Sequence, residues 1–337
     1  MDSLNIDRQT TGPSTTQAPA ASPERAKLLI DHKARLVNAP TRIVDQIRKN
    51  LTMPNPKYEQ AKKHRRYAGN ISPYIRLWEW IGLGISFPRG WVGQCLDMFQ
   101  SIGFVPEIED HRRLLDPVDF EFKGQLRDYQ QAAVNDALKR DFGVLQASTG
   151  SGKTVMALAV IAKRKQPTLI LVHNKELLYQ CADRTKSCLG IKPGLIGDGK
   201  FEIGNISVAI INTAQKRLDT LSLNYSQIIV DECHRVPSTM FTKVVQAFDS
   251  KFMLGLSATP YRRDGLTKLI YLTLGDRVHQ VDAQELKTNG AVMAPVVVRR
   301  ETSFQYAYAD DYPKMVSALT KDQDRNWQIA HDVIRQC

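Results

Sequence analysis

The residues best suited to chemistry form an octet, Ala147-Ser148-Thr149-Gly150-Ser151-Gly152-Lys153-Thr154. It follows an apolar run at 142–146 and precedes a helix-like segment at 155–163. In such a loop, backbone N–H groups at 148–152 curl around phosphates, and the helix N-terminus adds the positive end of its dipole. Lys153 would reach the β- and γ-phosphates, and the Thr154 hydroxyl would hold Mg²⁺. The octet predicts a nucleoside triphosphate site, with a glycine-rich turn that binds nothing as the alternative.

A second reactive segment is Asp231-Glu232-Cys233-His234, directly after the apolar run 228–230. An acidic residue at the end of a strand is where Mg²⁺ on a phosphate-loop threonine finds its second protein ligand, so Asp231 is expected to hold the metal. The adjacent Glu232 would orient and deprotonate the attacking water. An acidic surface turn is the alternative. Cys233 and His234 are weak candidates for metal ligands, because no second pair lies nearby.

The third segment is Ser257-Ala258-Thr259-Pro260, after the apolar run 252–256. The hydroxyl groups of Ser257 and Thr259 could sense the γ-phosphate together with the acidic segment. Taken alone, these four residues would be an ordinary turn, and their order after the other two segments makes them informative.

Short apolar runs that alternate with helix-like segments position these groups. Continuous Val, Ile and Leu runs separated by helices indicate strands buried on both faces of a parallel sheet. We therefore expect an α/β fold with helices on both faces of the sheet. The runs are 144–145, 168–172, 207–211, 228–230 and 252–256.

The 337 residues suggest two to three structural units. Residues 10–23 are all Thr, Gly, Pro, Ser, Gln or Ala, so we expect a disordered tail at 1–25. A small α+β accessory domain is expected at 26–118, with 43, 44, 47 and 51 on the inner face of one helix and 91, 95, 98, 99 and 102 on that of another. The ATP-binding lobe is expected at 119–295.

Charge and cysteine content limit the function classes. The net charge is +11, and residues 24–113 contain 16 Lys and Arg against 9 Asp and Glu, which favours a polyanionic partner bound there. No apolar run approaches the roughly 18 residues of a membrane span. Five scattered cysteines without a C-x-x-C pair suggest neither a disulfide framework nor a zinc module. We expect an intracellular, cytoplasmic protein with reduced thiols.

Further segments, in the same order as the three above, match one known family. They are Leu126-Arg127-Asp128-Tyr129-Gln130, Leu171-Val172-His173-Asn174-Lys175-Glu176-Leu177 and Asn212-Thr213-Ala214-Gln215. From about residue 124 to 337 the chain resembles superfamily 2 helicases of the DEAD/DEAH class, most closely the XPB-like and phage UvsW-like branch. The resemblance implies a RecA-like sheet, the cofactors ATP and Mg²⁺, and DNA as partner, either as a single strand or as a duplex junction.

The resemblance also implies roles for single residues. Gln130 would hydrogen-bond adenine and Arg127 would stack on it, although a buried ion pair would explain the arginine equally well. The tracked DNA strand would be contacted by His173, Lys175, Thr213 and Gln215. Coupling between nucleotide and DNA would depend on His234, Ser257 and Thr259. Arg263 stands where XPB-like proteins often have glutamate, so a DNA-melting role of 261–265 is not carried over.

The same resemblance implies a second lobe and an overall function. Residues 296–337, with a strand-like 296–299 and a helix-like 322–336, would be a linker and the start of a second RecA-like lobe, which would lie in missing sequence or in another chain. Without its arginines, the chain should hydrolyse ATP weakly. The expected function is an ATP-dependent DNA helicase or translocase, in processes such as DNA repair. The alternatives are an RNA helicase, a non-hydrolysing regulatory module, and a motor subunit of a restriction or defence system.

The accessory region resembles the N-terminal segment of bacterial XPB-like helicases through 54–58 and 87–90. Its basic run would bind DNA phosphates through Lys62, Lys63, Arg65 and Arg66, next to the aromatic Tyr67. A solvated helix face explains this run equally well. Trp78, Trp80 and Trp91 are expected in the core more than as platforms for bases.

Overall fold

The computed structural model describes residues 25–65, 67, 69–235, 238–259, 265–282, 298–308 and 311–336. The predicted tail, Arg66 and 261–264 therefore lie outside the described residues, apart from Arg25. The chain divides into two compact units, Met1–Val292 and Met293–Cys337. The first unit contains both the accessory region and the sheet that bears the octet, so the boundary expected at 118 stays a prediction.

The largest element of the first unit is an eight-stranded sheet with the order β11-β10-β12-β9-β13-β14-β8-β15. Neighbouring strands are parallel except at one end, where β11 pairs with β10 in antiparallel fashion. The inner strands β9, β12, β13 and β14 are buried along almost their whole length, as predicted, whereas the edge strands β11 and β15 are exposed or half-buried. The strands are β8 Phe142–Gln146, β9 Thr168–Val172, β10 Gly194–Gly197, β11 Lys200–Phe201, β12 Ile206–Ile210, β13 Gln227–Val230, β14 Phe252–Ser257 and β15 Arg277–Gln280.

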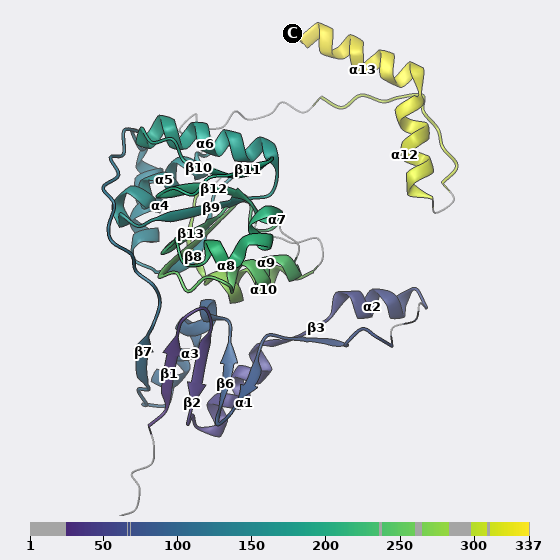
Figure 1. Ribbon diagram of the computed structural model, residues 1–337. Helices are drawn as coiled ribbons and strands as arrows, with labels where there is room; N and C mark the ends of the chain where they lie inside the picture. The colour runs from purple at the N-terminus through teal and green to yellow at the C-terminus, as the bar shows by residue number, and fades with distance from the viewer. Residues whose placement is uncertain are drawn as a thin grey trace, which may run out of the picture. The chain divides into compact units, whose positions relative to one another are not determined.

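Helices cover both faces of this sheet, which confirms the predicted α/β architecture (Figure 1). One face is packed by α4 Asp128–Leu138, α5 Lys153–Arg164 and α6 Lys175–Leu189. The other is packed by α7 Ile211–Ala214, α8 Leu218–Leu221, α9 Ser238–Val245 and α10 Thr267–Leu274. The short 3₁₀ helix η2, Gln215–Arg217, joins α7 to α8.

The accessory region contains a five-stranded sheet with the order β5-β6-β2-β1-β7. Helices α1 and α3 supply most of its remaining core: Ile43, Ile47, Cys95 and Phe99 are buried as predicted. The elements are β1 Lys27–Ile30, β2 Ala34–Val37, α1 Thr41–Asn50, β5 Glu79–Ile81, β6 Gly84–Phe87, η1 Arg89–Trp91, α3 Val92–Ser101 and β7 Glu107–Asp110.

A short two-stranded ribbon and a helix project from this sheet (Figure 1). We call this feature the arm, residues 52–76; it comprises β3 Thr52–Pro54, α2 Pro56–Lys63 and β4 Tyr74–Arg76. Residues 74–80 are divided between two strands that belong to different sheets. The chain leaves the ribbon after Arg76, because the Leu77 N–H donates to the Leu51 carbonyl, and β5 then joins the other sheet.

Buried arginine contacts join the accessory sheet to the large sheet. The Arg89 guanidinium donates to the carbonyls of Asp31 and Ser250, at 3.0 and 2.9 Å, and lies 5.1 Å from the Phe142 ring centre. Arg113 forms a two-pronged ion pair with Asp249, at 2.8 and 3.0 Å. Burial lowers the pKa of Arg89 to about 9, so it is charged at neutral pH.

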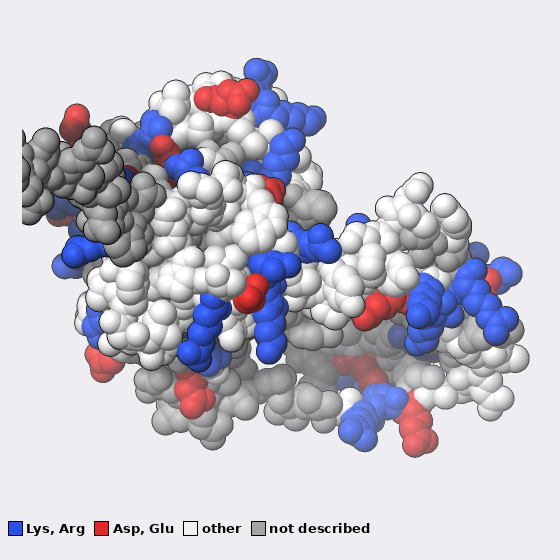
Figure 2. All heavy atoms as spheres, turned by 90° about the horizontal axis from the view of Figure 1, so that it is seen from below, with Lys and Arg blue, Asp and Glu red and all other residues white. Residues whose placement is uncertain are grey.

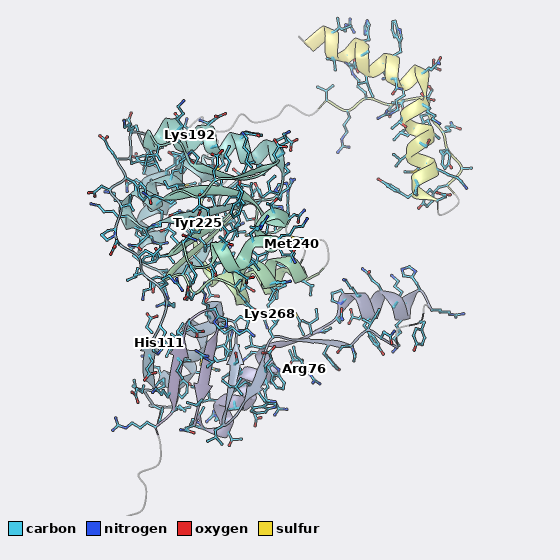
Figure 3. All side chains as sticks on the ribbon, viewed as in Figure 1. Arg76, His111, Lys192, Tyr225, Met240 and Lys268 are labelled. Atoms are coloured by element: carbon cyan, nitrogen blue, oxygen red, sulfur yellow. The ribbon has the colours of Figure 1, made fainter. Side chains whose placement is uncertain are left out.

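Other contacts at this junction come from α10. Leu266, Leu269 and Leu272 pack in the accessory core, and Lys268 Nζ donates to the Asn50 carbonyl at 3.0 Å (Figure 3). The accessory region and the large sheet are thus packed against each other over several elements.

In the second unit, the described residues form helices α12 Tyr312–Lys321 and α13 Gln323–Gln336. The helix expected at 322–336 is confirmed. The strand expected at 296–299 is not present at 298–299, where no partner strand is described, and 296–297 lie outside the described residues. None of the helices in the described ranges is long and apolar enough to span a bilayer.

Candidate active site

The octet forms a loop between β8 and α5, at the carboxyl edge of the large sheet. Gly150 and Gly152 have φ angles of 85° and 84°, which glycine adopts without strain. A Cβ atom at Gly152 would lie 2.5 Å from Nε2 of Gln130, so a side chain there would displace this amide. Helix α5 begins at Lys153, two residues before the predicted start, so the positive end of its dipole adjoins the loop.

Lys153 is brought against the acidic segment. Its side chain is 8% exposed, and Nζ donates to the Ala147 carbonyl at 3.2 Å. The same atom lies 3.5 Å from Oε1 of Glu232. Two groups that the sequence assigned to phosphate binding and water activation therefore meet in one buried cluster.

The backbone after β13 is held by both neighbouring strands. The Asp231 N–H donates to the Leu171 carbonyl of β9 at 2.9 Å, and the Cys233 N–H donates to the Leu256 carbonyl of β14 at 3.0 Å. Between them, Glu232 has a φ of 46°, a left-handed conformation that is uncommon for a residue other than glycine. Conformations of this kind concentrate at functional sites, where the surroundings enforce them.

Burial, and next the charge of Glu232, raise the pKa of Asp231 to about 6. A buried carboxylate at this position is stabilised by a cation, and Mg²⁺ prefers oxygen ligands of this kind. In the described ranges, no three His, Cys, Asp or Glu side chains gather closely enough to hold a metal alone. Asp231 and the half-buried Thr154 fit an ion that takes its other ligands from water and nucleotide phosphates.

His234 connects the acidic segment to the third segment. Its Nδ1 lies 2.9 Å from Ser257 Oγ and 3.3 Å from Oε2 of Glu232. Burial lowers the pKa of His234, so the ring is neutral at neutral pH. Thr259 is exposed two residues beyond Ser257, and its part in coupling stays a prediction.

Comparisons with known proteins agree with this geometry. Residues 123–262 match the family model described as type III restriction enzyme, res subunit. DNA 3'-5' translocase XPB2 of Sulfurisphaera tokodaii is 36% identical over 183 residues, which cover 53% of this chain and 42% of the relative. The probable helicase D10 of Escherichia phage T5 is 34% identical over 173 residues, covering 51% and 38%. These relatives agree with the resemblance of the sequence to superfamily 2 helicases of the XPB-like and UvsW-like branch.

Two further similarities concern an RNA helicase and a solved helicase structure. A putative ATP-dependent RNA helicase, L396 of Acanthamoeba polyphaga mimivirus, is 32% identical over 206 residues, covering 58% of this chain and 38% of the relative. The UvsW helicase structure from bacteriophage T4 covers 75% of this chain and 99% of its own, with a TM-score of 0.58 and 18% identity, which supports the fold. The chain spans about two fifths of the length of these curated relatives.

Beside the phosphate loop, the predicted adenine residue Gln130 is buried and hydrogen-bonded to the loop backbone. Its Nε2 donates to the Ser151 carbonyl at 2.9 Å, and its Oε1 accepts from the Arg127 N–H at 3.0 Å. Tyr129, which the sequence reasoning missed, donates its hydroxyl to the same carbonyl at 3.0 Å. The sequence does contain an indication of this role, because Tyr129 directly precedes Gln130 in the segment 126–130. Arg127 is exposed, and adenine recognition by either residue stays a prediction.

The DNA contacts predicted on the large sheet begin where β9 and β12 end. Lys175 Nζ pairs with Asp198 Oδ2 at 2.9 Å, an oxygen that also accepts from the Tyr179 hydroxyl at 2.7 Å. His173 is half-buried, its Nδ1 has no hydrogen-bond partner among the described residues, and burial lowers its pKa. Thr213 lies in α7 and Gln215 begins η2.

The basic run of the accessory region is not part of this cluster. Lys62 and Lys63 end α2, and Arg65 follows it; all three are exposed on the arm. Figure 1 shows α2 well away from α5, whose N-terminus adjoins the phosphate loop. DNA binding by either group of residues stays a prediction.

Proposed function

We propose that the chain is the ATP-binding part of an ATP-dependent DNA helicase or translocase. The single observation that supports this most is the approach of Lys153 Nζ to within 3.5 Å of Glu232 Oε1, at the carboxyl edge of a parallel sheet. This contact places a cation that can bind phosphates beside a carboxylate that can activate water. The two residues come from a phosphate loop and from an acidic segment that follows it along the chain.

The side chains divide the chemistry among them. Lys153 exchanges its carboxylate partner for the β- and γ-phosphates of ATP, which releases Glu232 to orient and deprotonate the attacking water. Thr154 and Asp231 would hold Mg²⁺, which would neutralise charge on the phosphates. The N–H groups of the loop and the helix dipole of α5 bind the phosphate oxygens.

Movement along DNA would follow from closure of two lobes around ATP. The contact of His234 with both Glu232 and Ser257 would transmit the state of the nucleotide to the end of β14. A second RecA-like lobe, from the rest of the protein or from another chain, would supply arginines to the γ-phosphate. Such arginines are worth roughly 10³–10⁵ in rate in related phosphoryl transfer, so residues 1–337 alone would hydrolyse ATP slowly.

DNA is the proposed track because the relatives with the names XPB2, Rad25 and XPB are described as DNA translocases or helicases. The names of two viral relatives favour RNA as a second candidate. Contacts to the phosphate backbone do not distinguish the two sugars.

The test uses the full-length protein and measures ATP hydrolysis with single-stranded DNA and with RNA of the same sequence. DNA should stimulate hydrolysis several-fold more than RNA. Equal or greater stimulation by RNA would favour the second candidate. No stimulation by either would contradict a nucleic-acid motor.

A further inference from the structure

The segment Thr41–Ile81 is the most basic part of the chain. It contains nine Lys and Arg residues against three Asp and Glu, so six of the eleven net positive charges lie in about an eighth of the sequence. This segment includes helix α1, the arm and strand β5. Figure 2 shows that Lys and Arg side chains also outnumber Asp and Glu over the face seen from below.

Exposed aromatic rings lie in the same segment. Tyr67 is 85% exposed, Trp80 58% and Tyr74 53%. Sequence reasoning placed the tryptophans mainly in the core, and this is correct for Trp91, which is buried, but wrong for Trp80. A single exposed ring is common on protein surfaces, but several exposed rings in one basic segment indicate an interaction site.

Trp80 stands at the root of the arm in a cluster with one other tryptophan and two arginines. Trp78 is half-buried and fixed by a hydrogen bond from Nε1 to Thr52 Oγ1 at 2.9 Å, and its ring meets that of Trp80 edge-on at 5.7 Å. The Arg48 guanidinium lies 5.2 and 5.5 Å from the centres of the two rings. Arg76, at the end of β4, lies 5.9 Å from that of Trp78 (Figure 3).

These contacts give the two tryptophans different roles. Trp78 is held by the ribbon and has a structural function. Trp80 is positioned by its neighbours while more than half of its surface stays open to a ligand. A surface cation–π contact stabilises the fold by only about 0.5–1 kcal/mol, so stability alone does not require a tryptophan at this position.

Positive charge predominates from the root of the arm near Trp80 to its tip. Two of the three acidic residues are already paired, since Asp45 accepts from Arg48 at 3.1 Å and Glu79 from Lys33 at 3.2 Å. The third, Glu59, is on α2, where four exposed cations outnumber it in and just after the helix: Lys57, Lys62, Lys63 and Arg65.

We propose that Trp80 stacks on an unpaired base of single-stranded nucleic acid, whose phosphates follow the cations from Arg48 and Arg76 toward α2. Exposed aromatic rings interleaved with cations are the usual means of binding single strands without sequence preference. A duplex fits less well, because its bases are already stacked and are not available to an isolated ring. This site lies on the accessory region, outside the strand-contacting segments of the helicase lobe.

The inference depends on the proposed function only for the class of ligand, and its test does not involve ATP. The full chain, without nucleotide, is titrated with oligothymidylate of about 20 nucleotides, and binding is followed by anisotropy and by tryptophan fluorescence. Trp80→Ala should weaken binding roughly 5- to 150-fold, the range for loss of one base–aromatic stack. Trp80→Phe should retain most of the affinity but lose the fluorescence quenching.

Matched variants separate stacking from general effects. Trp327→Ala removes a tryptophan that is 72% exposed in the second unit and should leave oligothymidylate binding unchanged. The triple variant Lys62→Ala, Lys63→Ala and Arg65→Ala should flatten the plot of log affinity against log salt by roughly 2 units, because about 0.7 is expected per phosphate contact on a single strand. Binding of a blunt duplex should depend on Trp80 far less than binding of the single strand.

Wild-type affinity of Trp80→Ala for oligothymidylate, in a protein with an unchanged circular dichroism spectrum, would overturn the proposal. So would an equal loss of duplex and single-strand binding. If Trp80→Ala lost binding to a polyglutamate peptide but still bound oligothymidylate, the surface would be assigned to an acidic protein partner instead. DNA-stimulated hydrolysis that fails while Trp80 still binds single strands would reject the proposed function and leave this site in place.

Discussion

Nδ1 of His234 lies 2.9 Å from Oγ of Ser257 and 3.3 Å from Oε2 of Glu232. The imidazole thus touches both the carboxylate expected to activate water and the end of the neighbouring strand β14. Ser257 is the hydrogen-bond partner of Nδ1, whereas Oε2 of Glu232 is buried and has no hydrogen-bond partner among the described residues. Burial lowers the pKa of His234, so the ring is neutral at neutral pH.

Replacing Ser257 with Ala should uncouple hydrolysis from movement. One hydrogen bond is lost, worth about 0.5–1.5 kcal/mol, so the amount of DNA unwound or strand displaced per ATP should fall roughly 2- to 10-fold. Mg·ATP affinity should remain near that of the wild type, because the phosphate loop is intact. Both rates are measured on the full-length protein, and an unchanged ratio of displacement to hydrolysis would contradict a coupling role.

Lys153→Ala should abolish retention of ATP. The loop loses its mobile cation, and Glu232 loses the partner that lies 3.5 Å from it. Calorimetry with Mg·ATP provides the measurement, with Lys163→Ala at the other end of α5 as a control that should bind normally. Affinity like that of the wild type in the Lys153 variant would refute the phosphate-loop assignment.

The stability of the metal-free protein should respond to pH through Asp231. Its pKa of about 6 in the folded protein is higher than the roughly 3.9 of an unfolded aspartate, so its neutral form favours folding. This stabilisation is complete below about pH 4 and is lost as the pH rises through 6. Asp231→Asn does not titrate there, and at pH 8 it should be more stable than the wild type by up to about 3 kcal/mol.

Urea unfolding in EDTA at a series of pH values measures this difference. The free energies of unfolding of the wild type and Asp231→Asn should be closest below about pH 4, diverge as the pH rises from about 4 to about 6, and then differ by a constant amount. A difference that stays constant from pH 4 to pH 8 would mean that Asp231 is not held in an environment that disfavours its charge.

Arg89→Ala should destabilise the first unit by about 2–4 kcal/mol, because the carbonyls of Asp31 and Ser250 are left without their buried donor. Thermal unfolding of this variant is compared with that of Arg42→Ala, an exposed arginine of α1 whose loss should change stability by less than about 0.5 kcal/mol. Equal melting temperatures for the two variants would show that the junction around Arg89 contributes little.

Five of the eight strands in the large sheet were predictable, because β8, β9, β12, β13 and β14 each contain a short, continuous apolar run. The run 168–172 coincides with β9, and the octet follows a strand with the bounds expected for it. Parallel strands that all end at one edge then bring Lys153 and Glu232 together, although neither residue indicates the other by sequence spacing alone. This site follows from the sequence once the topology is assumed.

The accessory sheet was predicted less well for a physical reason. Strands β1 and β2 have four residues each and alternate between buried and half-buried positions, so their pattern is weak. The break between β4 and β5 depends on which partner strand each one finds, which is a long-range property. The hydrogen bond from Gln130 to the Ser151 carbonyl was not predicted either. The motif suggested that this amide binds a ligand, whereas in the structure it binds the phosphate loop.

The central claim is that Glu232 is the catalytic base of an ATP hydrolase, and Glu232→Gln tests it most directly. The amide keeps the size of the side chain but cannot accept a proton from water. In full-length protein with DNA, we predict that Mg·ATP affinity stays within a few-fold of the wild type while hydrolysis falls by at least about 10²-fold. Hydrolysis at the wild-type rate by this variant would contradict the account.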